Sequence, residues 1–160
     1  MSAAPRRRAR GARAAAIDMG ILPGLLGYHL RCAHAAVFQH FARSVGAAEI
    51  TPPQLGTLLL VEANPGLSQS AVAEALRFDR STLVQVVDRL EERGLVKRET
   101  SSRDRRSHAL ALTAAGVKLL ARLKEMLAVH ESEIAAPLDA NERAALLALL
   151  GRLHGAKRNG

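Results

Sequence analysis

The residues with the clearest chemistry in this sequence form the charged segment Arg103-Asp104-Arg105-Arg106. The segment lies between two short runs that alternate like strands, so it is predicted to be the tip of a β-hairpin. Three guanidinium groups at a narrow tip suit insertion into an electronegative minor groove of DNA. Asp104 does not favour phosphate binding, and we expect it to pair with a neighbouring arginine and fix the shape of the loop. Taken alone, the segment is also compatible with an exposed, salt-bridged turn.

A second group of polar side chains lies on one face of a helix predicted over residues 79–93. Leu83, Val87 and Leu90 recur at helical spacing and are predicted to face the core. The opposite face carries Arg80, Ser81, Thr82, Val84, Gln85, Asp88 and Arg89. Hydroxyl and amide groups can read base edges in the major groove, and arginine suits phosphate or guanine. A solvated helix face is the alternative interpretation of this pattern.

The other reactive side chains give weak evidence for a redox or metal site. Cys32 is the single cysteine, and it stands three residues after His29. Zinc needs three or four ligands, and His34 and His40 do not share a face with that pair. We therefore expect no metal and no cofactor, and we interpret Cys32 as an inert buried thiol. A redox- or metal-responsive regulator that uses Cys32 or His29 remains the alternative.

Enzyme motifs are absent from the sequence. There is no P-loop, no Gly-x-Ser-x-Gly and no His-Glu-x-x-His. The carboxylates occur at predicted helix caps and on helix faces. We expect no catalytic residue, and a hydrolase or transferase is disfavoured.

The composition indicates a polyanionic partner. The net charge is +8 and the isoelectric point is about 10.9. Residues 1–16 contain five arginines and no acidic residue, so they are predicted to be a disordered basic arm. Such an arm could contact DNA or be an inert tail, and the sequence leaves both open.

The sequence also bears on the compartment. No apolar run reaches the roughly 20 residues that a membrane span requires. The stretch Ile21 to Leu26 is interrupted by Pro23 and Gly24 and leads into an amphipathic helix, so it is not interpreted as a signal peptide. A single cysteine fits a reducing compartment. We expect a cytoplasmic protein without a membrane partner, although a basic module at a membrane surface remains an alternative.

Four helices are predicted before the hairpin. They span residues 22–43, 51–63, 68–76 and 79–93. Thr51 and Gln54 form a capping box, Ser68 and Asp79 are N-caps, and Gly94 supplies a left-handed end. The third and fourth helices are short and joined by a tight turn, which is the spacing of a helix-turn-helix.

The rest of the chain predicts a hairpin and two more helices. Strands are expected over residues 95–100 and 107–112. Thr113 caps a helix that ends at Pro137, and a capping box at Asp139 opens a final leucine-rich helix. Aromatic residues make up only 2%, so leucine, alanine and valine must fill the core. The predicted fold class is mainly α (α+β), with about six helices and a two-stranded wing.

Several blocks of residues together carry a family resemblance. They are Leu76 to Asp79, Ser81-Thr82, Val87-Asp88-Arg89-Leu90-Glu91, Gly94-Leu95-Val96, Asp104-Arg105-Arg106 and Leu112-Thr113-Ala114-Ala115-Gly116. In their order and spacing they resemble the MarR family of bacterial winged helix-turn-helix transcriptional regulators. The resemblance covers roughly residues 22–155, nearly everything except the basic arm.

The resemblance implies a homodimer built from the first, fifth and sixth helices, with two lobes that read double-stranded DNA. It implies that Gln85 reaches base edges and that an arginine of the wing enters the minor groove. It also implies a crevice between the dimer helices and the DNA lobe for small effectors, often phenols or aromatic carboxylates. Binding in that crevice usually lowers the affinity for DNA.

The site residues follow from the face of the helix, the wing and this resemblance. The residues expected to contact DNA are Ser68, Gln69, Arg80, Ser81, Thr82, Gln85, Arg89, Arg103, Arg105 and Arg106, with Asp104 stabilising the wing. Tyr28, His29 and Arg31 lie on the first helix, where the effector crevice of the family opens. Arginine can hold a carboxylate or phosphate, and tyrosine can meet an aromatic ring. A tyrosine that merely spans the dimer interface is an equally good interpretation of Tyr28.

The domain organisation is expected to follow these elements. It comprises a basic arm (1–16), an N-terminal dimerisation helix (17–48), a winged helix-turn-helix (49–113), C-terminal dimerisation helices (114–155) and a tail (156–160). The expected function is a transcriptional regulator, a repressor, that binds a pseudo-palindromic operator as a homodimer. An aromatic acid or its CoA thioester is the expected releasing effector.

Overall fold

The computed structural model describes residues 17–100 and 108–155. The predicted basic arm, the tail and the wing tip at 101–107 lie outside the described residues, and so do the side chains of Thr100 and His108. A boundary between two compact units falls between Ala35 and Ala36, inside the first helix. The domain limits expected at 48/49 and 113/114 stay predictions.

The first unit contains a 3₁₀ turn, η1 (Leu22–Gly24), and the start of helix α1 (Leu26–Ser44). The sequence predicted a helix from residue 22, but the α-helix begins four residues later. Leu25 has an extended backbone (φ −96°, ψ 122°), which separates the turn from the helix. The Pro23-Gly24 pair explains the break, because both residues are poor in helix interiors. His29 Nε2 lies 2.8 Å from the Pro23 carbonyl oxygen and ties the turn to α1.

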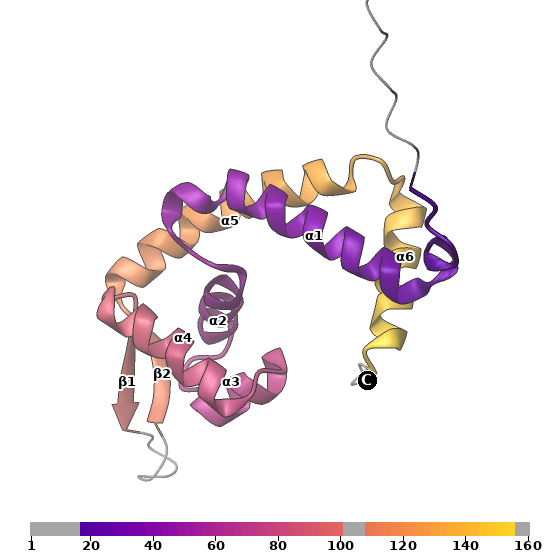
Figure 1. Cartoon of the computed structure of the whole chain (residues 1–160). Helices are drawn as coiled ribbons and strands as arrows, with labels where there is room; N and C mark the ends of the chain where they lie inside the picture. Colours follow the sequence, from indigo (N-terminus) through magenta and orange to yellow (C-terminus); the bar gives the residue numbers. More distant parts are fainter. Residues whose placement is uncertain (1–16, 101–107, 156–160) are drawn as a thin grey trace, which may run out of the picture. The chain divides into compact units, whose positions relative to one another are not determined.

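The second unit contains the helix-turn-helix lobe. It consists of α2 (Pro52–Ala63), α3 (Gln69–Leu76), α4 (Arg80–Glu92), β1 (Val96–Thr100) and β2 (His108–Leu112) (Figure 1). The predicted capping box of Thr51 and Gln54 and the predicted caps Ser68 and Asp79 are all confirmed. A short turn, η2 (Gly46–Ala48), connects α1 to α2.

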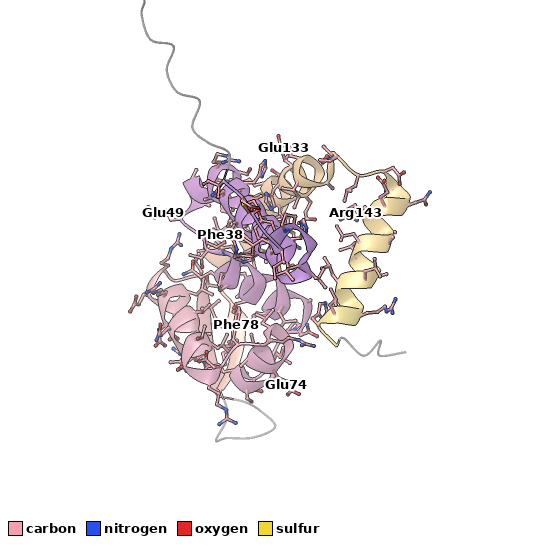
Figure 2. All side chains as sticks on the ribbon, turned by 45° about the vertical axis from the view of Figure 1, so that its right-hand side comes forward. Phe38, Glu49, Glu74, Phe78, Glu133 and Arg143 are labelled. Carbon is pink, nitrogen blue, oxygen red and sulfur yellow. The ribbon has the colours of Figure 1, made fainter. Side chains whose placement is uncertain are left out.

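The lobe is held together by an aliphatic core to which every element contributes. Leu58 of α2, Val72 of α3, Leu83 of α4, Val96 of β1 and Leu110 of β2 are each at most 1% exposed. Phe78, labelled in Figure 2, is partly buried and packs against this core from the turn between α3 and α4. The predicted inward face of α4 is confirmed, since Val87 and Leu90 are also fully buried.

The two strands form the antiparallel wing, with Val96 opposite Leu112 and Arg98 opposite Leu110. The backbone N–H of Leu110 donates to the Leu67 carbonyl oxygen at 2.9 Å, which links β2 to the segment before α3. The wing is therefore anchored to the helix-turn-helix on one side and continues through Thr113 into the next helix.

Helix α5 (Ala114–Ala135) begins immediately after the wing, where Thr113 caps it and also donates to the Gly94 carbonyl oxygen at 2.6 Å. Gly94 has φ +66°, as its predicted role required. Gly116 lies so close to the wing that a Cβ added there would stand 2.0 Å from the Leu95 carbonyl oxygen. The Thr113 to Gly116 block thus fixes how α5 leaves the wing.

Helix α6 (Ala140–Leu153) starts at the predicted capping box of Asp139 and Glu142. Arg143, labelled in Figure 2, lies 3.5 Å from Glu131 of α5 in an ion pair. The apolar side chains of α6 remain largely exposed, including Leu146 at 45% and Leu149 at 52%. Among the described residues, no helix is long and apolar enough to cross a membrane.

Candidate nucleic-acid interface and effector site

The outward face of α4 is solvent-exposed along its length. Arg80, Ser81, Val84, Gln85 and Arg89 are all exposed, while the opposite face of the helix is buried. Arginine and glutamine can reach phosphate or base edges, and a valine side chain suits the methyl group of thymine. This face has the composition and the freedom that a recognition helix needs. The base contacts of its individual residues stay predictions.

The start of α4 is fixed by Asp79. Its carboxylate accepts hydrogen bonds from Ser81 Oγ at 2.5 Å, Thr82 Oγ1 at 2.6 Å and the Thr82 backbone N–H at 2.7 Å. The bond from Ser81, followed by those from Thr82, holds the pKa of the Asp79 carboxyl well below its usual range. Because both hydroxyl protons are donated to Asp79, Ser81 and Thr82 would meet DNA as acceptors, not as donors.

A hollow of about 250 Å³ opens between α3 and α4 on the same side of the lobe. Its lining consists of Gln69, Ser70, Ala73, Arg80, Leu83 and Val84. Two of the predicted DNA contacts, Gln69 and Arg80, therefore border one depression. Ser68 caps α3 through its hydroxyl, which accepts from the Ala71 backbone N–H at 3.3 Å.

Arg98 of β1 is a residue of this region that the sequence analysis did not single out. Its guanidinium donates to Asp88 and Glu91 of α4 and, through Nε at 3.3 Å, to Gln69 Oε1 of α3. Burial lowers the pKa of Arg98, but the bonds to Asp88 and Glu91 outweigh it and raise the pKa overall. Strand alternation could have located Arg98, because it shares the inward side of β1 with buried Val96.

The wing arginines Arg103, Arg105 and Arg106, with Asp104, lie outside the described residues. Their contacts with DNA and the pairing of Asp104 stay predictions. The strands that lead to this segment, β1 and β2, are described and form the expected hairpin.

The first unit holds an open hollow of about 820 Å³ at the start of α1. Its lining consists of Met19, Leu22, Leu25, Leu26, Gly27, Tyr28 and Arg31. Two of the three predicted effector residues, Tyr28 and Arg31, therefore share a largely apolar depression, with the Arg31 guanidinium carbon 5.6 Å from the centre of the Tyr28 ring. His29 does not line it and is bonded to Pro23 instead.

Cys32 lies beside these residues and is half-buried. Arg31 Nη2 donates to Cys32 Sγ at 3.6 Å. A hydrogen bond with Cys32 and the charge of that group raise the pKa of the Tyr28 phenol, whereas Arg31 lowers it. Over residues 17–100 and 108–155, no three His, Cys, Asp or Glu side chains gather as a metal site would require.

This architecture defines a winged helix-turn-helix that is preceded and followed in the chain by additional helices. The MarR family profile matches residues 48–107. A relative from Thauera aromatica, described as a putative transcriptional regulatory protein for the hcr operon, is 44% identical and covers 84% of this chain and 82% of its own. The chain belongs to the MarR family and is a transcriptional regulator of that type, which confirms the predicted family and fold.

Solved structures agree with this assignment. The transcriptional repressor CouR bound to a 23-mer DNA duplex matches with a TM-score of 0.83 and 41% identity, over 88% of this chain and 99% of that one. CouR bound to p-coumaroyl-CoA matches with a TM-score of 0.81 and 39% identity, over 89% and 100%. The PcaV regulator from Streptomyces coelicolor, in complex with its natural ligand, matches with a TM-score of 0.80 and 34% identity, over 89% and 98%.

Proposed function

We propose that this protein is a repressor that binds a pseudo-palindromic operator as a homodimer and is released by an aromatic acid or its CoA thioester. The proposal that the protein binds DNA rests on the two faces of α4. One face is exposed and largely polar, and the opposite face is buried in the core of the lobe. A helix presented in this way fits the major groove, and the adjoining wing is suited to the minor groove.

The homodimer is supported by apolar surface that the described chain leaves uncovered. On α6, Leu146, Leu147, Leu149 and Leu153 are between 45% and 56% exposed. Clusters of large exposed apolar side chains mark association surfaces in soluble proteins. A two-fold dimer would cover them and set two recognition helices about one DNA turn apart, roughly 34 Å, on a pseudo-palindromic site.

The effector half is supported by the hollow at the start of α1. Its apolar lining suits an aromatic ring, and Arg31 can hold a carboxylate or a phosphate. CouR, which shares 39% identity with this chain, binds p-coumaroyl-CoA, so an aromatic CoA thioester is a reasonable first ligand to test. Release follows only when the ligand prefers a conformation that fits the operator poorly, because equal affinity for both states shifts nothing.

The test uses the full chain and a duplex enriched from a random-sequence library. Binding is measured by fluorescence anisotropy with p-coumaroyl-CoA, p-coumarate or free CoA added. We expect the thioester or the acid to weaken DNA binding at least tenfold, and we expect Arg31→Ala and Tyr28→Ala to reduce the response without changing the ligand-free affinity. DNA binding that neither the thioester nor the acid weakens would refute the effector, whereas failure to enrich any duplex would refute DNA binding itself.

A second candidate trigger is oxidation of Cys32. Cys32 is only half-buried, so an oxidant can reach its sulfur, to which Arg31 Nη2 donates at 3.6 Å. Peroxide should then weaken DNA binding by wild type and leave Cys32→Ser unaffected. If both proteins respond alike, Cys32 is not the sensor.

A further inference from the structure

We propose that Arg98 is a positioning residue for DNA binding, which locks the wing to both helices of the helix-turn-helix so that they meet DNA as one rigid surface. This inference rests on the proposed DNA-binding function. Arg98 lies in β1, so it belongs neither to the outward face of α4 nor to the wing tip, the two regions expected to contact DNA.

The contacts of Arg98 span three elements. From β1, its guanidinium reaches Asp88 and Glu91 of α4 and Gln69 of α3. Its backbone N–H also donates to Glu91 Oε1 at 3.2 Å. Glu91 thus holds both the main chain and the side chain of Arg98. The planar guanidinium offers donors in fixed directions, so these contacts restrain orientation as well as distance.

The position of Arg98 in the strand is unusual for a charged residue. The side chains of its neighbours Lys97 and Glu99 are 55% and 49% exposed and pair with each other at 2.6 Å on the outer side. Arg98 shares the inner side with Val96, and its side chain is only 22% exposed. An apolar residue would suit that side without desolvating a charge. An arginine there is better explained by the directional contacts that it makes.

Gln69 shows a related compromise. Its amide oxygen accepts from Arg98, and its amide nitrogen is buried without a hydrogen-bond partner in the described structure. A buried donor without an acceptor is unfavourable. We infer that the hydrogen bond from Arg98 sets the orientation of the Gln69 amide, although this orientation leaves the NH₂ group of Gln69 without a partner. Gln69 lines the hollow between α3 and α4.

Arg98 also changes the electrostatics of the recognition helix. Asp88 and Glu91 lie three residues apart on α4, so they are neighbours on the helix surface. Unpaired carboxylates beside a DNA-binding face would repel phosphates. Arg98 neutralises their charge from the side of β1, and Arg80, Gln85 and Arg89 stay exposed on the outward face of α4. Arg98 thus fixes strand β1, the described part of the wing, against α3 and α4.

The experiment compares Arg98→Met, which removes the charge and the donors, with Arg98→Lys, which keeps only the charge. A third protein combines Arg98→Met with Asp88→Asn and Glu91→Gln. The control is Lys124→Met, which removes a paired cation elsewhere in the fold, since Lys124 lies 2.5 Å from Glu62 between α5 and α2. The probe is a duplex that the wild type enriches from a random library. The readouts are affinity per active protein, guanine methylation protection in the major groove, and hydroxyl-radical protection in the flanking minor grooves.

We expect Arg98→Met to weaken binding at least tenfold and to lose minor-groove protection while major-groove protection persists. Arg98→Lys should fall between it and the wild type, the triple variant should regain part of the affinity, and Lys124→Met should stay within twofold. The proposal is overturned if Arg98→Met binds within twofold of wild type, if Lys124→Met loses as much, or if both protections fall together. Should Arg98→Met not fold, Arg98→Lys decides, and an unchanged footprint and affinity there would refute the role. A wild type that enriches no duplex would instead refute the DNA-binding function.

Discussion

At the scale of single residues, Asp79 combines two tasks in the recognition helix. It caps α4, and it also takes the hydroxyl protons of Ser81 and Thr82. Replacing an N-cap aspartate by alanine leaves N–H groups of the first turn unsatisfied, whereas asparagine can still accept. Asp79→Ala should therefore lower the melting temperature by about 2–4 °C, and Asp79→Asn should lower it less. Thermal unfolding followed by circular dichroism measures both.

The same residue predicts a dependence on pH. The pKa of Asp79 in the folded protein is depressed, so its stabilisation is present above the unfolded pKa of about 3.9 and is lost as the pH falls through the folded pKa. The difference in melting temperature between wild type and Asp79→Ala should be constant from neutral pH to about pH 5 and shrink below about pH 4. A difference that disappears near neutral pH would contradict this origin.

Gly116 gives a prediction that rests on steric overlap, whereas the prediction for Asp79 rests on lost hydrogen bonds. A Cβ there would overlap the Leu95 carbonyl oxygen at 2.0 Å, and a backbone atom cannot move aside cheaply. Gly116→Ala should therefore destabilise the fold by about 3 kcal/mol or more, as severe overpacking does. Urea denaturation provides the measurement.

The matched control for that variant is Gly56→Ala in α2. Its new methyl group would stand 3.7 Å from the nearest Leu76 side-chain atom, an ordinary contact. Alanine also favours helix over glycine, so this variant should be neutral or more stable by up to about 1 kcal/mol. Similar losses at the two glycines would exclude the steric explanation.

Local chemistry explains which residues could be predicted from the sequence. The caps Thr51, Ser68, Asp79 and Thr113 were predicted because their partners lie three residues away. The contacts of Arg98 were not predicted, because its partners are 7 to 29 residues distant and only folding brings them together. The sequence also placed the hydroxyl groups of Ser81 and Thr82 on the outward face of α4, but it did not predict that both donate hydrogen bonds to Asp79.

At the scale of elements, α1 and α5 are joined by a pair of histidines. His40 Nδ1 lies 2.7 Å from His130 Nδ1 and 3.1 Å from Ser44 Oγ, while His40 Nε2 lies 3.2 Å from Glu133, which Figure 2 labels. A carboxylate only accepts, so His40 Nε2 is the atom that donates to Glu133. Of the two facing Nδ1 atoms one donates and the other accepts, and His130, which is 2% exposed, has its Nδ1 buried against His40.

This arrangement makes the less buried histidine the more important one. His40→Leu leaves the buried Nδ1 of His130 without its hydrogen-bond partner and should cost about 1–3 kcal/mol. His130→Leu leaves His40 Nδ1 with the Ser44 hydroxyl and should cost less, although His130 is the more buried residue. Chemical denaturation of the two variants compares them. A larger loss for His130→Leu would show that ring packing against Phe41, not the hydrogen bond, dominates.

The elements themselves were largely predictable, since periodicity and caps mark their ends. The recognition helix, the wing and the helix after it fall within one or two residues of expectation. The start of α1 differs because η1 replaces the first predicted turn. Leu26, Leu30 and Val37 recur at helical spacing on α1, yet all three are at least 40% exposed, whereas Phe41 further along the helix is buried. Periodicity identifies an apolar face but not the surface that covers it.

At the scale of the whole molecule, the uncovered face of α6 leads to a prediction about assembly. Leu146 and Leu149 lie three residues apart on one side of the helix and are about half exposed. Two glutamates there would place unpaired charges in the proposed dimer interface, and removing those charges from water would disfavour the dimer. The double variant Leu146→Glu/Leu149→Glu should therefore be a monomer at micromolar concentration by analytical ultracentrifugation.

DNA affinity should fall together with assembly. A dimer engages two half-sites, and the second contact is effectively intramolecular, so its loss should weaken operator binding by about 10²- to 10⁴-fold. The control is Ala144→Glu/Ala148→Glu, which adds the same charge to the opposite, exposed side of α6. The control should remain dimeric and lose little affinity, because the interface is untouched. A monomer that still binds the enriched duplex as tightly as wild type would refute the dimeric mode, and equal dissociation of both variants would assign the effect to net charge on α6.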